Sequence, residues 1–236
     1  MTSDIRRRDF ADGETLAAAL AEWTAEKLAA AIAARGAALL AVSGGKSPER
    51  FFEALSSEPL DWTRIAITLV DERRVPDDSP RSNARLVRAA LLRNRAAAAA
   101  FAPLADSRLS PDQELAAASA RIANLPMPAD LVVLGMGDDG HTASWFPGAT
   151  GLADAMDPGA RLLVAPIEAP GAGEPRLTLT GRVVLRARAL ALLIEGPDKL
   201  ATLAAALADG PAEAMPIRAV LRGAADRLTI FAAERA

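Results

Sequence analysis

Short, unbroken apolar runs alternate with segments of helical periodicity along most of this chain. The runs have the length and composition of strands buried on both faces, and they occupy residues 37–42, 65–70, 131–134, 161–165, 189–194 and 227–231. Helical patterns fall between most of them, at residues 14–35, 82–93, 110–124 and 198–208. Because parallel strands require crossover connections, which are usually helical, this alternation predicts an α/β fold. We expect three layers, with helices on both faces of a mostly parallel, Rossmann-like sheet.

Two helix boundaries are marked by residues with strong capping preferences. Gly36 follows the first helical pattern and suits the left-handed conformation that ends many helices. Ser47 and Pro48 suit the N-cap and first position of another helix, since proline has no amide hydrogen to leave unpaired there. We find no convincing linker in the 236 residues, so we interpret residues 1–236 as a single domain.

The composition excludes several kinds of chemistry. The chain has no cysteine and one histidine, which excludes disulfides, thiolate metal sites and multi-histidine metal sites. Its formal net charge of −3 provides no global attraction to nucleic acid or to an anionic membrane. No secretion signal is recognisable, and no run reaches the roughly 18 apolar residues of a membrane span. We expect a cytoplasmic protein with no metal, cofactor, nucleic-acid or membrane partner; the sequence does not determine the oligomeric state, for which a monomer is the working expectation.

Three unusual loops follow strands of the predicted sheet. They comprise residues 43–48, 71–83 and 135–148. In open α/β sheets, ligands bind outside the carboxyl ends of the strands. We therefore expect these loops to meet at one edge and to carry the function.

Two of these loops imitate nucleotide-binding motifs. Residues 135–140 match G-x-G-x-x-G, but Pro147 and Gly148 interrupt the long helix that a dinucleotide site needs, so we reject that interpretation. Gly45, Lys46 and Ser47 resemble the end of a P-loop, yet its first glycine would fall at Leu40, inside a strand. What remains is a glycine turn before a helix N-terminus, which favours a smaller anion.

His141 is the candidate general base. It is the only imidazole of the chain, and it follows carboxylates and a glycine-rich turn at the predicted ligand edge. A serine-triad alternative stays open, because residues 41–45 approach a nucleophile elbow and Ser43, Asp71 and His141 follow in the chain order of an α/β-hydrolase. That alternative is weakened by the position of Ser43 after the first predicted strand of the sheet.

Several cations accompany these loops. Arg73 follows Asp71 and Glu72 and offers a planar donor fork that suits phosphate or carboxylate. Arg176 and Lys199 occur in comparable loop positions farther along the chain. Together they predict a local anion site in a protein whose net charge is negative.

These segments together resemble the 6-phosphogluconolactonase family. Residues 43–48 are similar to its S-G-G-x-S/T-P loop, and Asp71-Glu72-Arg73 with Ser82-Asn83 is similar to its D-E-R and S-N pair. Residues 135–148 match its longest signature over nearly the whole length, and residues 176–180 and 196–199 resemble two later motifs. The matches occur in order and span about residues 40 to 200.

The resemblance implies hydrolysis of 6-phospho-D-glucono-1,5-lactone to 6-phosphogluconate, the second step of the oxidative pentose phosphate pathway, with no cofactor. His141 would accept a proton from the attacking water, and Asp139 would orient it. Amides of Gly44 and Gly45 or of the Gly137 region would stabilise the oxyanion. Arg73, Arg176 and Lys199 would hold the phosphate. The implied substrate-binding residues are Ser43, Gly44, Gly45, Lys46, Asp71, Arg73, Asn83, Gly137, Arg176 and Lys199.

Glucosamine-6-phosphate deaminases resemble this family in their sheet and their D-G-H core, so they are the main alternative. They typically have D-E-Y at the second loop and a glutamate in an N-E-P segment after the histidine. Here Arg73 stands at the first place and Trp145-Phe146-Pro147 at the second, which favours lactone hydrolysis. A catalytically silent sugar-phosphate-binding module is the other alternative.

Overall fold

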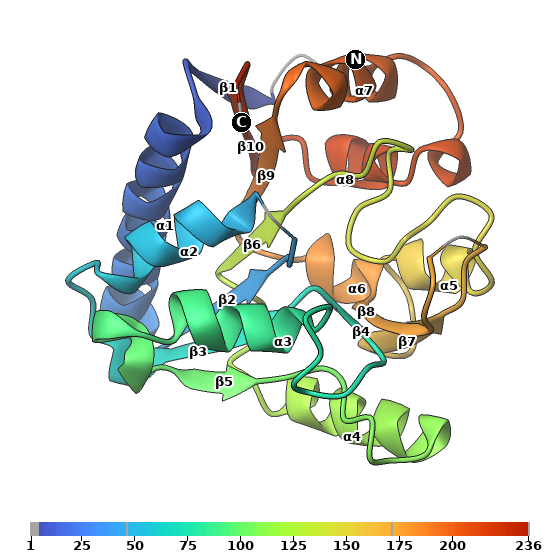
Figure 1. The fold of residues 1–236 in the computed structure, drawn as a ribbon, viewed down its shortest axis with the longest axis horizontal. Helices are drawn as coiled ribbons and strands as arrows, with labels where there is room; N and C mark the ends of the chain where they lie inside the picture. The colour runs from blue at the N-terminus through green and yellow to red at the C-terminus, as the bar shows by residue number, and fades with distance from the viewer. Residues whose placement is uncertain (1–4, 46, 171, 236) are drawn as a thin grey trace.

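A computed structural model describes residues 5–45, 47–170 and 172–235 (Figure 1). The described strands form a seven-stranded sheet in which every recorded pairing is parallel. Its order is β1 (Arg6–Phe10), β10 (Leu228–Ala233), β9 (Leu190–Glu195), β6 (Leu131–Leu134), β2 (Ala38–Val42), β3 (Ile65–Leu69) and β5 (Ala100–Ala102). The predicted parallel α/β fold is confirmed.

The interior strands are apolar because helices cover both faces of the sheet. All residues of β2, β6, β9 and β10 are buried. In Figure 1, α1 and α2 lie on one side of these strands and α6 and α8 on the other. The helices are α1 (Gly13–Arg35), α2 (Pro48–Ser56), α3 (Asn83–Leu86), α4 (Pro111–Ala123), α5 (Leu152–Met156), α6 (Gly181–Val184), α7 (Pro197–Leu207) and α8 (Ile217–Gly223). No helix in the described ranges is long and apolar enough to cross a bilayer.

Local sequence explains where the helices begin and end. The Asp12 side chain accepts a hydrogen bond from the Thr15 amide at the start of α1 (2.9 Å), and Gly36 ends the helix in the left-handed region with φ of 79°, as predicted. Pro48 begins α2 as predicted, but Ser47 forms no capping bond because its backbone is already helical. The expected helix over residues 82–93 is also wrong in part, since α3 ends at Leu86 and a π-helical turn, Val87–Leu91, follows.

A second, three-stranded antiparallel sheet lies beside the main sheet and was not predicted. Its order is β4 (Asp71–Arg73), β8 (Arg176–Leu179) and β7 (Val164–Ile167). The apolar run at residues 161–165 therefore contributes to this small sheet and not to the main one. The segments around Asp71 and Arg176, expected as loops, are strands.

The sequence analysis also did not predict the two edge strands of the main sheet, β1 and β5. Short turns complete the fold: η1 (Trp62–Arg64), η3 (Asn94–Ala98) and η4 (Ala212–Ala214).

Candidate active site

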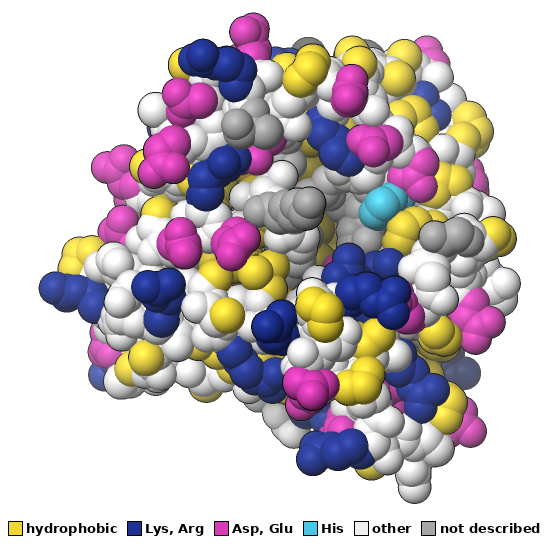
Figure 2. Space-filling view, in the orientation of Figure 1, with side chains coloured by type: hydrophobic (Ala, Val, Ile, Leu, Met, Phe, Trp, Pro, Cys, Tyr) yellow, Lys and Arg dark blue, Asp and Glu magenta, His cyan; other side chains and the backbone are white. Residues whose placement is uncertain are grey.

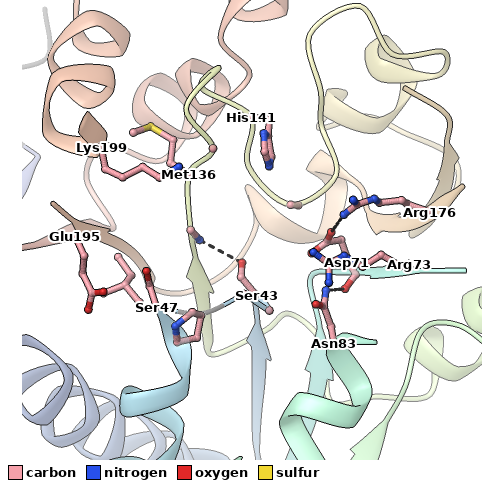
Figure 3. A pocket seen from close by; sticks show the side chains of 17 residues that line it. Ser43, Ser47, Asp71, Arg73, Asn83, Met136, His141, Arg176, Glu195 and Lys199 are labelled. Carbon is pink, nitrogen blue, oxygen red and sulfur yellow. Dashed lines mark hydrogen bonds and ion pairs between the residues drawn. The ribbon is translucent and has the colours of Figure 1, made fainter. Parts of the chain in front are cut away.

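A cleft of about 310 Å³ opens at the carboxyl edge of the main sheet, where the small sheet adjoins it (Figure 3). Loops after β2 and β6 and the end of β9 form one part of its lining, and β4 and β8 form the other. Figure 2 shows His141 at the rim of this hollow with basic side chains below it. The volume falls at the lower end of the range for small-molecule sites.

Most of the residues predicted to bind substrate line this cleft. They are Ser43, Gly44, Gly45, Asp71, Arg73, Asn83, Gly137, His141, Arg176 and Lys199. Asp139 lies next to the cleft, in contact with His141. Lys46 lies outside the described residues. The cleft also includes residues that were not predicted to bind substrate, namely Ser47, Pro48, Gly135, Met136, Ala143, Leu193 and Glu195.

The His141 side chain is held by Asp139. The Nδ1 atom lies 2.6 Å from Asp139 Oδ1, and the His141 amide donates to the same oxygen at 3.0 Å. Since a carboxylate can only accept hydrogen bonds, this contact places a proton on Nδ1 and leaves Nε2 free to accept one. Partial burial raises the pKa of Asp139, but hydrogen bonds and charge from His141 outweigh burial, so that pKa lies below its usual value.

Two glycines permit the close approach of side chains in the cleft. A Cβ at Gly137 would overlap the His141 ring, and one at Gly44 would overlap the Asn83 amide. The Gly137 amide already donates to the His141 carbonyl at 2.8 Å. The Gly137 amide itself is therefore already paired, and the amides of Gly44 and Gly45 and the other amides of the Gly137 region remain the predicted oxyanion donors.

The serine-triad arrangement is not assembled in the described residues. Ser43 Oγ accepts a hydrogen bond from the Gly135 amide at 3.2 Å. Asp71 accepts one from Ser144 Oγ at 2.6 Å, while the imidazole has Asp139 as its carboxylate partner. Ser43, Asp71 and His141 thus share the cleft without forming the chain of hydrogen bonds that a triad needs.

Strand pairing brings two arginines together on the small sheet. Arg73 and Arg176 stand directly opposite each other in the β4–β8 register, and like charges in that position destabilise a sheet. Asp71 offsets part of this cost, since its Oδ2 lies 3.7 Å from Arg176 Nη1. The Nε atoms of both arginines are buried without a hydrogen-bond partner in the described structure. Burial lowers the pKa of Arg176, although Asp71 opposes this shift. Two buried Nε donors without partners, side by side on two positive side chains, are typical of a site that favours an anion.

Two buried carboxylates, Glu72 and Glu195, accept hydrogen bonds from residues near the cleft. Glu72 Oε1 accepts from the amides of Arg73 and Asn83, both at 2.8 Å, and Oε2 accepts from the Ala84 amide at 2.6 Å. Burial raises the pKa of Glu72 even though these amides oppose the shift. Glu195 accepts a hydrogen bond from Arg50 at 3.1 Å. The sequence contained a signal for Glu195, because it is a charged residue at the end of the apolar run that forms β9.

Lys199 lies apart from the arginine pair. It belongs to the first turn of α7, as the helical pattern at residues 198–208 predicted, and it faces the cleft from the side opposite Arg73 and Arg176 (Figure 3). Its Nζ atom forms an ion pair with Asp138 Oδ1 at 2.7 Å. The three predicted cations therefore surround the cleft from two directions.

The fold and site define a class: α/β proteins with a basic cleft at the carboxyl edge of a parallel sheet and a hydrogen-bonded histidine–aspartate pair beside it. The chain belongs to the family described as glucosamine-6-phosphate isomerases/6-phosphogluconolactonase, whose family model matches residues 11–230. It is 52% identical over 222 residues to the 6-phosphogluconolactonase of Rhizobium meliloti, covering 94% of this chain and 96% of that one. It is 50% identical over 222 residues to that of Mesorhizobium japonicum, with 94% and 92% covered.

A solved structure agrees over the whole chain. The crystal structure of a 6-phosphogluconolactonase from Shewanella baltica superposes with a TM-score of 0.93 at 38% identity and covers 100% of both chains. The family resemblance seen in the sequence is confirmed.

Proposed function

We propose that this chain is an enzyme that hydrolyses 6-phospho-D-glucono-1,5-lactone to 6-phosphogluconate in the pentose phosphate pathway. The observation that carries the proposal is the 2.6 Å contact of His141 Nδ1 with Asp139 inside a cleft that also holds two like-charged, incompletely paired arginines. The relatives that share half of its sequence bear the name of this activity. The proposal includes a location in the cytoplasm, where sugar phosphates are formed and consumed.

In the proposed reaction, His141 Nε2 accepts a proton as water attacks the lactone carbonyl. A bond forms between the water oxygen and C1, and the carbonyl electrons move onto its oxygen. That oxyanion lies against the amides of Gly44 and Gly45, which have no internal partner recorded among the described backbone hydrogen bonds. Collapse of the intermediate breaks the bond from C1 to the ring oxygen, and His141 returns the proton to that oxygen. The new carboxylic acid loses its proton to water.

Arg73 and Arg176, which lie together, are assigned to the substrate phosphate, and Lys199 is expected to attract it as a point charge from the opposite side of the cleft. Each charge-assisted hydrogen bond contributes about 1.5 to 3 kcal/mol. Two such bonds at the low end sum to about 3 kcal/mol, or roughly 100-fold in kcat/KM. The phosphorylated lactone should therefore be preferred over glucono-1,5-lactone by at least this factor.

The test is a lactonase assay on freshly generated substrate, scored as acceleration over spontaneous hydrolysis, with and without excess chelator. We expect acceleration that chelator does not reduce. A rate that collapses with chelator and returns with a divalent cation would contradict the metal-free mechanism. Release of ammonia from glucosamine 6-phosphate would instead identify a deaminase, and ligand binding without turnover would identify a binding module.

A further inference from the structure

Phe146 connects the two charged parts of the cleft. Its ring centroid lies 4.2 Å from that of the His141 imidazole, with an angle of 38° between the planes. The Arg176 guanidinium carbon lies 5.1 Å from the same centroid. One aromatic ring thus contacts both the candidate base and a candidate anion-binding residue.

The Asp139 contact by itself does not orient the imidazole fully. Both hydrogen bonds between these residues use the single oxygen Asp139 Oδ1, which fixes Nδ1 but leaves the ring free to turn about that point. The side chain of His141 is also 29% exposed, so general burial does not immobilise it. The ring also lies close to Gly137, which has no side chain, so a side-chain contact is still needed to fix where Nε2 points.

Phe146 is itself held rigidly enough to supply that contact. Its amide donates to the Ser144 carbonyl at 3.1 Å, and its carbonyl accepts from the Ala149 amide at 3.1 Å. The neighbouring Trp145 is fully buried and donates from Nε1 to the Leu179 carbonyl at 3.1 Å. The loop therefore presents the Phe146 ring at a defined position.

The chemistry of the ring also suits its neighbours. The face of an aromatic ring attracts cations, and Arg176 is a permanent one. The imidazole becomes a second cation when it has taken a proton from water. An aromatic side chain can favour both states, whereas an aliphatic side chain of similar size would supply contact without that attraction.

We propose that Phe146 is a positioning residue that fixes the plane of the His141 imidazole and couples it to Arg176. The inference rests on the proposed role of His141 as general base. Because a small misplacement of a catalytic group is costly, Phe146→Leu should lower kcat by about 10- to 100-fold. KM should change by less than about 3-fold, since Arg176 keeps its charge and its ion pair with Asp71, while the contact with His141 matters in the transition state.

The experiment combines kinetics with the proton–nitrogen NMR correlation spectrum of the imidazole, which is unambiguous because His141 is the only histidine. In Phe146→Leu we expect the carbon-bound imidazole protons to lose the ring-current shift and the nitrogen signals to move toward averaging of the two tautomers. Phe146→Tyr should restore the signals and bring kcat within about 3-fold of the parent enzyme. Phe101→Leu is the matched control, because Phe101 also lies under an arginine, Arg88 at 5.3 Å, but remote from His141.

The proposal is overturned if Phe146→Leu keeps both kcat and the imidazole signals, if Phe146→Tyr is folded but restores neither, or if Phe101→Leu reproduces the loss. If Phe146→Leu does not fold, kcat and the imidazole signals are measured on Phe146→Met instead. The NMR measurement also separates this proposal from the proposed function. A wild-type protein without lactonase activity would contradict the function, whereas the imidazole signals of the variants would still decide the positioning role.

Discussion

The seven-stranded sheet brings backbone groups and glycines to the cleft, whereas the three-stranded sheet brings charged side chains. In the main sheet, β2 and β6 are buried on both faces, so their functional groups appear only in the loops that follow, at Ser43 and Gly135 onward. In the small sheet, the strands themselves carry Asp71, Arg73 and Arg176. Burial on both faces keeps charge out of the interior of a strand, so the charged residue of β9 that lines the cleft, Glu195, stands at the end of that strand. A strand with one accessible face can display charge at every second residue.

This difference assigns the reaction chemistry to the main sheet and the recognition of phosphate to the small sheet. The loops of the main sheet hold His141 and the candidate oxyanion amides, so changes there should affect the reaction of any lactone. The strands of the small sheet hold the arginines, so changes there should depend on the phosphate. Variants on the two sheets therefore distinguish chemistry from recognition.

The largest effect is expected for His141→Asn, on the main-sheet side. Asparagine keeps polar atoms near Asp139 but cannot take up and return a proton. A positioned acid–base group contributes at least about 100-fold, so kcat should fall by that factor or more for both the phosphorylated and the unphosphorylated lactone. Circular dichroism should confirm a folded protein. Retention of most activity would remove His141 from the mechanism.

Arg73→Met and Arg176→Met test the small sheet. Loss of one charge-assisted contact of about 1.5 to 3 kcal/mol should lower kcat/KM for the phosphorylated lactone by roughly 10- to 100-fold and leave glucono-1,5-lactone nearly unaffected. Lys199→Met should act in the same direction but more weakly, since lysine binds as a point charge. Equal losses on both lactones would show that the side chain serves the carbonyl or the fold.

For the same arginine variants we expect no matching loss of stability, in contrast to the loss of kcat/KM. Arg73 and Arg176 stand directly opposite each other in the β4–β8 pair, and like charges in that position lower the free energy of unfolding. Removing Arg73 should therefore leave the melting temperature unchanged or raise it while recognition is lost, whereas removing Arg176 should raise it less, because the buried Asp71 then loses its ion pair. A clear drop in melting temperature for both variants would mean that the pair supports the fold.

The sequence predicted the main sheet well because its strands are continuous apolar runs separated by helices. It did not predict the small sheet, since Asp71, Arg73 and Arg176 make β4 and β8 look like polar loops. The edge strand β1 was missed for a related reason, as its arginines are exposed. Strand propensity is hardest to recognise where side chains are selected for a site and not for a core.

The candidate residues were found from motifs, but their contacts were not. Whether Asp139 could reach His141 depends on a turn at Gly140, whose φ of 77° is not visible in a pattern of residue types. The pairing of Arg73 with Arg176 depends on strand register between distant segments. Phe146 was noted only as a departure from the deaminase pattern, because its contact with His141 arises from the path of the loop.

Ser43→Ala should have a modest effect. The Ser43 hydroxyl accepts one hydrogen bond from the Gly135 amide, which joins the loops after β2 and β6. Losing that bond should cost about 0.5 to 1.5 kcal/mol of stability and lower kcat/KM by less than about 10-fold. Chemical denaturation and lactone kinetics measure the two quantities. A loss as deep as that of His141→Asn, together with a trapped acyl-enzyme, would restore the serine-triad mechanism.

The smallest effect concerns the contribution of Asp139 to stability. Its pKa is lowered in the folded protein, so the folded state binds a proton less readily than the unfolded state does. Asp139 therefore stabilises the protein at pH values above its ordinary pKa of 3.8, and this contribution is lost as the pH falls through the lowered folded value. The side chain is 50% exposed, so solvent screening keeps the contribution below about 1 kcal/mol.

Asp139→Asn measures this contribution against the backbone contacts of the same loop. Hydrogen bonds from the Gly137 amide to the His141 carbonyl and from the Ile217 amide to the Gly140 carbonyl, at 2.8 and 2.9 Å, do not involve the carboxylate and persist in the variant. The difference in unfolding free energy between parent and variant should be under about 1 kcal/mol near pH 5 and should shrink toward zero below about pH 3, as other carboxylates titrate alike in both proteins. A difference of several kcal/mol that disappears at low pH would show that the charge on Asp139, and not the backbone, holds the loop that carries His141, whereas a difference independent of pH would show that its charge does not contribute.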